Sequence, residues 1–187
     1  MFNNISLTNL CKHIWGCRTA NGWDINGLGQ QKDGRGNICP VTIILPTVAM
    51  EAKQMEGNLI ENFMSHLDKT INEAKDMLLE RFKYICSQNP ASAKFMYENG
   101  LMAGYEPEEG IISALKHGTL AVGQIALAET LQILVGCDHT EPKGIELAKR
   151  IEQLFKDKCA EFKETYKLNF GVYYSPKRLL GDVWATI

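Results

Sequence analysis

The chain has 187 residues, of which 45% are hydrophobic and 22% charged, and its formal net charge at pH 7 is −2. This length suits one domain or a part of a larger one, and the composition is that of a folded globular chain, which excludes global disorder. The balanced charge gives no field that favours nucleic acid, and no apolar run approaches the roughly 20 residues of a membrane-spanning helix.

Two further features of the composition bear on location and metal content. The N-terminal residues 1–5 form neither a basic leader nor an apolar signal region, so we expect a cytoplasmic protein. No two of the six cysteines form a C-x-x-C pair, which argues against a zinc ribbon and a thioredoxin-like motif. The pattern Cys11-x-His13 with Cys17 fits no common metal site, and adjacent ligands such as those at 137–139 rarely bind one ion. We therefore expect no metal site in this chain.

The first long segment with a clear signal is a loop. Residues 16–37 are rich in glycine, asparagine and aspartate, residues that supply or tolerate positive φ, whereas residues 1–15 carry weak signals and are expected to be irregular. A loop of about 20 residues is longer than an ordinary connection, and such loops in compact domains are usually functional.

Strands and helices alternate after this loop. A β-branched apolar run without alternation predicts a strand at 39–45 that is buried on both faces. An apolar stripe with spacings of three and four predicts a helical tract at 47–86, which Gly57 divides in two. Further helices are expected at 91–102, 111–116, 127–135 and 143–166, and further strands at 118–123 and 169–174.

This order of elements predicts an α/β architecture. Three strands are few for such a sheet, and their exposed edges would be prone to pairing with other chains. We therefore interpret the chain as part of a larger α/β assembly with long helices and an incomplete sheet.

The first candidate site is the run Gly-Cys-Arg-Thr at 16–19. A guanidinium such as that of Arg18 favours the thiolate form of the neighbouring Cys17. On these residues alone, a structural or incidental cysteine is the more common case.

The second candidate site is the run Gly-Arg-Gly-Asn at 34–37. Glycines on both sides of Arg35 would let backbone N–H groups approach an anion, and Asn37 would place a neutral amide at the start of a buried strand. The alternative is a simple turn that Asn37 caps, and the residues alone favour this alternative.

In this order, the motifs resemble the finger-loop region of the anaerobic (class III, glycyl-radical) ribonucleoside-triphosphate reductases. The motifs are Gly-Cys-Arg-Thr (16–19), Asn-Gly-Leu-Gly (26–29), Gly-Arg-Gly-Asn-Ile (34–38), Val-Thr-Ile (41–43), Leu-Pro (45–46), His-Gly-Thr-Leu-Ala-Val-Gly (117–123), Ala-Glu-Thr (128–130) and Asn-Phe-Gly-Val-Tyr-Tyr-Ser-Pro (169–176). The resemblance covers residues 16–176, and we expect the segments 1–15 and 177–187 to lie outside the family's pattern.

The resemblance implies a fold and a chemistry. In that family a ten-stranded α/β barrel surrounds a loop with a cysteine at its tip. A separate iron–sulfur activase, which uses S-adenosylmethionine, makes a glycyl radical, and this radical oxidises the cysteine to a thiyl radical. The thiyl radical abstracts the 3′-hydrogen of a ribonucleotide, and the 2′-hydroxyl leaves as water, which yields deoxyribonucleotides for DNA synthesis.

The resemblance also implies roles for five residues. Cys17 matches the cysteine at the loop tip, and Asn37 lies where the family places a polar residue near the sugar. Arg18 is the implied substrate-binding neighbour of Cys17. Ser175 and Pro176 correspond to a turn that opens a helix whose N-terminal amides can hold the phosphates of a ribonucleoside triphosphate.

Several parts of the family's pattern have no counterpart in this sequence. They are the glycyl-radical loop, the zinc-binding cysteines near it, the nucleotide-sensing region and the first barrel strands. Lys177 and Arg178 stand where the family has Ala-Glu. We therefore expect no cofactor in this chain itself, because the glycyl radical and the zinc site would belong to other segments.

Three hypotheses follow. The first is a fragment of the reductase that is inactive alone and acts with the remaining reductase segments and the activase. The second is a non-catalytic remnant with at most weak nucleotide binding. The third is an interaction module that offers its strand edges to a partner or to a second copy of itself.

Overall fold

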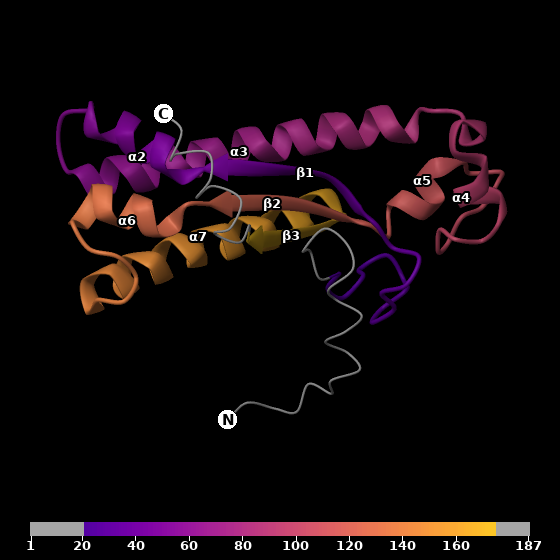
Figure 1. Cartoon of the computed structure of the whole chain (residues 1–187). Helices are drawn as coiled ribbons and strands as arrows, with labels where there is room; N and C mark the ends of the chain where they lie inside the picture. Colours follow the sequence, from indigo (N-terminus) through magenta and orange to yellow (C-terminus); the bar gives the residue numbers. More distant parts are fainter. Residues whose placement is uncertain (1–20, 175–187) are drawn as a thin grey trace, which may run out of the picture.

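Three parallel strands form the sheet at the centre of the molecule (Figure 1). The computed structural model describes residues 21–174. The strands β1 (Asn37–Ile44), β2 (Thr119–Ile125) and β3 (Asn169–Tyr174) pair in the order β1-β2-β3. Both connections between neighbouring strands run in the same direction across the sheet, so right-handed crossovers bring their helices to one face.

Helices fill both connections. The first contains α2 (Leu45–Lys53), α3 (Leu59–Cys86), η1 (Pro90–Ala93), α4 (Lys94–Glu98) and α5 (Ile111–Leu115). The second contains α6 (Leu127–Val135) and α7 (Pro142–Tyr166). Gly57, at φ 110°, and the N-cap residue Asn58 separate α2 from α3, as the sequence predicts. Among the described residues, no helix combines the length and apolar character needed to cross a bilayer.

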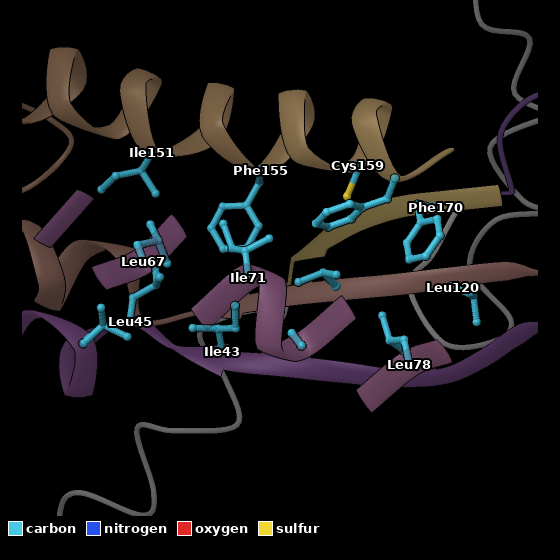
Figure 2. Close-up of a cluster of buried hydrophobic side chains, with 14 of the residues drawn as sticks. Ile43, Leu45, Leu67, Ile71, Leu78, Leu120, Ile151, Phe155, Cys159 and Phe170 are labelled. Carbon is cyan, nitrogen blue, oxygen red and sulfur yellow. The ribbon is translucent and has the colours of Figure 1, made fainter. Parts of the chain in front are cut away.

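The core lies between the sheet and the two long helices α3 and α7, which also contact each other (Figure 2). Each helix buries one apolar stripe, as expected from the spacing of its residues. The α3 stripe consists of Phe63, Leu67, Ile71, Ala74, Leu78 and Phe82. The α7 stripe consists of Leu147, Ala148, Ile151, Phe155, Cys159 and Phe162. Ile43, Leu120 and Phe170 meet these stripes from β1, β2 and β3.

Most of the predicted elements are confirmed, and three expectations are wrong in part. The expected helix 91–102 is a 3₁₀ turn followed by the short α4, because the chain turns at Gly100 with φ 69°. The spacing of apolar residues in 143–166 predicts that Tyr166 continues the buried stripe of α7, but Tyr166 is exposed and lies outside it. The strand expected to be buried on both faces exposes Thr42 and Ile44, because α3 packs against its other face.

Candidate functional site

The candidate site lies on the face of the sheet that turns away from α3 and α7, which we call the site side. Side chains alternate between faces along a strand, so the neighbours of the core residues Ile38, Leu120 and Phe170 point to the site side. The strand register aligns two rows of such residues. The Asn37 row consists of Asn37, Thr119 and Asn169, and the Tyr173 row consists of Thr42, Gly123 and Tyr173.

Asn37 is the first residue of β1 and is half-buried, so an amide stands at the start of this strand as the sequence predicts. A register irregularity follows it between Ile38 and Val41, where Cys39 adopts a left-handed φ of 45°. Bulges of this kind occur next to active sites, where they re-aim side chains. The role of Asn37 near a substrate sugar stays a prediction.

The other four predicted site residues, Cys17, Arg18, Ser175 and Pro176, lie outside the described residues, and their roles stay predictions. The segment that follows Cys17 is described from residue 21 onward. Its contacts show how the loop joins the sheet.

Asp24, in this loop, is the centre of a buried polar cluster at the amino ends of β2 and β3. The residue is only 2% exposed. Oδ1 accepts hydrogen bonds from Nδ2 of Asn169 at 2.6 Å and from the backbone N–H of Asn26 at 3.1 Å. Oδ2 accepts from Nδ1 of His117 at 2.7 Å and from the backbone N–H of Leu28 at 2.9 Å. We call Asp24, Arg35, His117 and Asn169 the Asp24 network.

The charge state of Asp24 follows from these four donors. Burial raises the pKa of this carboxyl, but the hydrogen bonds from Asn169, Leu28 and His117 outweigh burial and lower the pKa to about 2. Asp24 is therefore ionised at neutral pH and can only accept hydrogen bonds. Nδ1 of His117 must then carry the hydrogen that it shares with Asp24.

Arg35 joins the loop to the strands from the other side. Its guanidinium is buried and donates from Nε to the backbone oxygen of His117 at 2.6 Å. Nη1 donates to the backbone oxygens of Gly22 at 2.8 Å and Gln31 at 2.7 Å. Burial lowers the pKa of this guanidinium, and the charge of Asp24 opposes that shift. The Arg35 guanidinium thus donates hydrogen bonds to three backbone carbonyl groups.

This geometry supports the turn interpretation of residues 34–37 over the anion site. Gly34 adopts φ 75°, and a Cβ there would meet the backbone nitrogen of Ala103 at 2.8 Å. The backbone N–H of Ala103 donates to the carbonyl of Gly34 at 3.0 Å. Gly34 therefore serves a close approach between two protein segments.

Sequence reasoning missed Asp24, His117 and Asn169 as a group. All three fall within or beside motifs that carry the resemblance, but His117 and Asn169 lie 93 and 145 residues from Asp24 along the chain. The local signal that could have drawn attention was an acidic residue in a glycine-rich loop. Nothing local pointed to its partners.

Tyr173 shapes the other end of the site side. Its ring lies directly over Gly123, where a Cβ would overlap the ring atoms. Its hydroxyl shares a hydrogen bond with Oγ1 of Thr42, which links β3 to β1 across β2. A larger residue at position 123 would therefore force the Tyr173 ring to move.

The four described cysteines, Cys39, Cys86, Cys137 and Cys159, are free. Burial raises the pKa of the Cys39 thiol, and it raises that of Cys86 to about 11 and that of Cys159 to about 12. These three thiols are protonated at neutral pH. Within residues 21–174, no group of three or more His, Cys, Asp or Glu side chains is placed to hold a metal ion.

Comparison with known protein families finds a match over nearly the whole chain. The sequence model of the anaerobic ribonucleoside-triphosphate reductases matches residues 2–185. This range extends on both sides beyond residues 16–176, over which the motifs were recognised.

Curated relatives give the same result at the level of single proteins. The anaerobic ribonucleoside-triphosphate reductases of Escherichia coli and Salmonella typhimurium are each 26% identical to this chain over 188 residues, and that of Haemophilus influenzae is 24% identical over 187 residues. Each alignment covers 95% of this chain and 25% of the relative. The chain thus spans about a quarter of the length of these relatives.

A solved structure shares the fold. The crystal structure of the anaerobic ribonucleotide reductase from Thermotoga maritima matches with a TM-score of 0.58 and 17% identity. The match covers 88% of this chain and 24% of that one. At this identity the likeness concerns the fold alone.

Proposed function

Because this chain belongs to the anaerobic ribonucleoside-triphosphate reductase family, we propose that it forms the segment of such an enzyme that carries the radical cysteine and one wall of the substrate site. The observation that carries this proposal is the family match. It covers the loop that contains Cys17 and all three strands, β1, β2 and β3. The reaction is the reduction of a ribonucleoside triphosphate to the deoxyribonucleotide.

The arrangement of the sheet supports this role. Asn37 stands on the site side at the end of the loop that contains Cys17, and this loop is joined to the same end of the sheet by the Asp24 network. Along β2 and β3, the site side carries the small residues Ala121 and Gly171 between the Asn37 row and the Tyr173 row. A polar residue and a loop at one end of a sheet suit the placing of a sugar against a thiol.

In this proposal the sheet is one part of the family's ten-stranded barrel. Each edge strand, β1 and β3, pairs with a single neighbour among the described residues, so both offer an edge to further strands. The remaining reductase segments would continue the barrel there. It stays a prediction that the segments 1–15 and 177–187 lie outside the family's pattern. A cytoplasmic location also stays a prediction.

The chemical role of this chain falls on Cys17. A glycyl radical in another segment, made by an iron–sulfur activase with S-adenosylmethionine, would supply the oxidising equivalent. The Cys17 thiol gives up its hydrogen atom, and the resulting sulfur radical takes the 3′-hydrogen of the ribonucleotide. The 2′-hydroxyl then leaves as water, two electrons and two protons from an external reductant reduce the remaining sugar, and the Cys17 thiol returns a hydrogen atom to C3′. Asn37 binds near the sugar, and Arg18, Ser175 and Pro176 contact the substrate.

The test is reconstitution. The 187-residue chain is combined anaerobically with the remaining reductase segments and the activase, and deoxyribonucleotide formation is measured. We expect Cys17→Ser to abolish turnover, because a hydroxyl does not form the radical, whereas Cys11→Ser in the same N-terminal segment retains it. Turnover by the Cys17→Ser assembly would overturn the proposal. Failure of every wild-type combination would favour the non-catalytic remnant.

A further inference from the structure

We propose that Asp24 is a positioning residue for Cys17, and that with His117 and Asn169 it ties the segment following Cys17 to the amino ends of β2 and β3. The catalytic consequence of this tie rests on the proposed function. The tie itself concerns only this chain and can be tested without the reaction.

The first step of the argument is the compact turn around Asp24. The carboxylate accepts the backbone N–H groups of Asn26 and Leu28, and the backbone N–H of Asp24 donates to the carbonyl of Gly29 at 2.8 Å. Residues 24–29 are thereby folded around one ionised side chain. A turn closed in this way moves as a unit.

The second step is the attachment of this turn to the strands. Asn169, the first residue of β3, donates to Asp24 and accepts from the backbone N–H of Ile25 at 3.1 Å. The side chain of Asn26 donates to the carbonyl of Lys116 at 2.8 Å, just before β2. His117 supplies a further bond from the same place. The turn is therefore fixed to two strands at once.

The third step is the rigidity of the His117 ring. Gly104 adopts φ 73°, and a Cβ there would lie 2.5 Å from Nε2 of His117. The ring is thus packed against backbone on one side while its Nδ1–H is directed at Asp24. A side chain at position 104 would therefore displace the His117 ring from the position in which it donates to Asp24.

The fourth step is the reach of the chain between the tie and the thiol. Asp24 follows Cys17 by seven residues, and Asn21, which follows it by four, is held by Thr119 and by the carbonyl of Arg35. Seven residues span at most about 25 Å and four at most about 14 Å, so both attachments lie close to Cys17 along the chain. Hydrogen-atom transfer is sensitive to position, because a misplacement of about 1 Å can cost about 100-fold in rate, and we therefore expect the attachment of this loop to matter for turnover.

Asp24→Asn tests the tie with almost no change in volume. One accepting oxygen becomes an N–H₂ group, so the backbone N–H of Asn26 or that of Leu28 loses its acceptor and the negative charge is removed. A suitable control is Gln124→Leu, which removes a buried hydrogen bond from Gln124 to Glu152 at 2.6 Å on the helix side of β2. Both variants lose buried polar contacts, but only the first touches the loop.

The readout is the alkylation rate of Cys17 in the 187-residue chain, measured by peptide mass spectrometry with iodoacetamide. We expect Asp24→Asn and His117→Ala to raise this rate about threefold or more, because residues 24–29, which follow Cys17 along the chain, are then no longer held to the strands. His117→Asn, whose amide can replace Nδ1 as donor, should bring the rate part of the way back to that of the wild type. Gln124→Leu should leave the Cys17 rate unchanged, and buried Cys159 serves as the internal reference.

Equal Cys17 rates in the wild type and in folded Asp24→Asn would overturn the inference. If Asp24→Asn and His117→Ala fail to fold, Asn26→Ala replaces them, since it removes only the side-chain bonds to the carbonyls of Lys116 and Lys167, and the same direction of change is required.

In the reconstituted reductase, we expect Asp24→Asn to lower kcat about tenfold or more per folded enzyme while KM for the ribonucleoside triphosphate stays within about twofold. An unchanged kcat would also overturn the inference. The two proposals fail separately, because the alkylation result is independent of turnover and Cys17→Ser tests turnover alone.

Discussion

Phe155, in the layer between α7 and the sheet, and Asp24, at the amino ends of the strands, are both buried, with 0% and 2% of their surface exposed. Phe155 is surrounded by other apolar side chains, and its contribution depends on the area that it removes from water. Asp24 depends on four donors that must each lie in the right direction. Although the two residues are equally buried, we therefore expect them to respond differently to mutation.

The difference also separates the tasks of the two regions. The apolar layer joins helices to strands, and a similar layer can be built from many combinations of large side chains. The Asp24 network joins a loop to two strands, and each member must supply a donor or an acceptor in a set direction. In this molecule the region that requires particular residues is the one next to the loop that carries Cys17.

The largest effect should follow from truncation in the apolar layer. We expect Phe155→Ala to lower the free energy of unfolding by about 3–5 kcal/mol, because it leaves a cavity between α7 and the sheet. Phe155→Leu, which nearly conserves the volume, should cost less than about 1.5 kcal/mol. Urea denaturation of the 187-residue chain measures both. A cost for Phe155→Ala no larger than that of Phe155→Leu would mean that the layer is not closely packed.

The second effect comes from a mutation in the Asp24 network that leaves the volume of the side chain almost unchanged. Asp24→Asn should cost about 3 kcal/mol in the same urea experiment, since a buried backbone N–H loses its acceptor and the charge-assisted hydrogen bonds lose their charge. The near-isosteric change in the network is then more costly than the larger change Phe155→Leu in the core. A larger cost for Phe155→Leu than for Asp24→Asn would show that the stability of the network does not depend on the direction of its hydrogen bonds.

The third effect is a pH dependence confined to the network. The pKa of Asp24 is about 2 in the fold, against about 3.9 for an exposed aspartate, so the unfolded chain binds more protons between these values. Stability from Asp24 is complete above about pH 4 and should fall by about 2 kcal/mol as the pH drops to 2. The difference in stability between wild type and Asp24→Asn should therefore shrink over this window, while that between wild type and Phe155→Leu stays constant. A constant Asp24 difference would mean that the hydrogen bonds of the network do not lower this pKa.

The fourth effect concerns the site side of β2. Gly123→Ala should cost about 2 kcal/mol, because its Cβ would overlap the ring of Tyr173. In a Tyr173→Ala background the same change should cost less than about 1 kcal/mol, because the ring is gone. Thermal unfolding of the four members of this double-mutant cycle measures the coupling. Additive costs would mean that the ring does not rest on Gly123.

The smallest effect is expected for a polar contact outside both regions. His66 and Glu51 form a 2.7 Å pair between α3 and α2, with 30% and 55% of their side chains exposed. Glu51→Gln should change stability by less than about 1 kcal/mol, because water screens and replaces this contact. A cost as large as that of Asp24→Asn would show that polarity, and not burial, explains the behaviour of the network.

Long periodic segments were predictable from the sequence. The stripes of α3 and α7 repeat over many turns, and α6 and β3 have the predicted bounds, because helix and strand periods are local properties of the chain. The helix expected at 91–102 was shorter, since Gly100 turns the chain where the apolar pattern alone would continue. The motifs from the Cys17 loop to β3, taken in order, were enough to indicate the family.

In the candidate site, too, some features were predictable from local sequence and others were not. Asn37 at the start of a strand was predictable from its neighbours, because a glycine-rich run followed by a β-branched run marks that boundary locally. The partners of Asp24 became visible only in the fold, because parallel strand order and register bring His117 and Asn169 to the same end of the sheet. Hydrogen bonds between residues 93 and 145 positions apart depend on that three-dimensional arrangement, which no local pattern encodes.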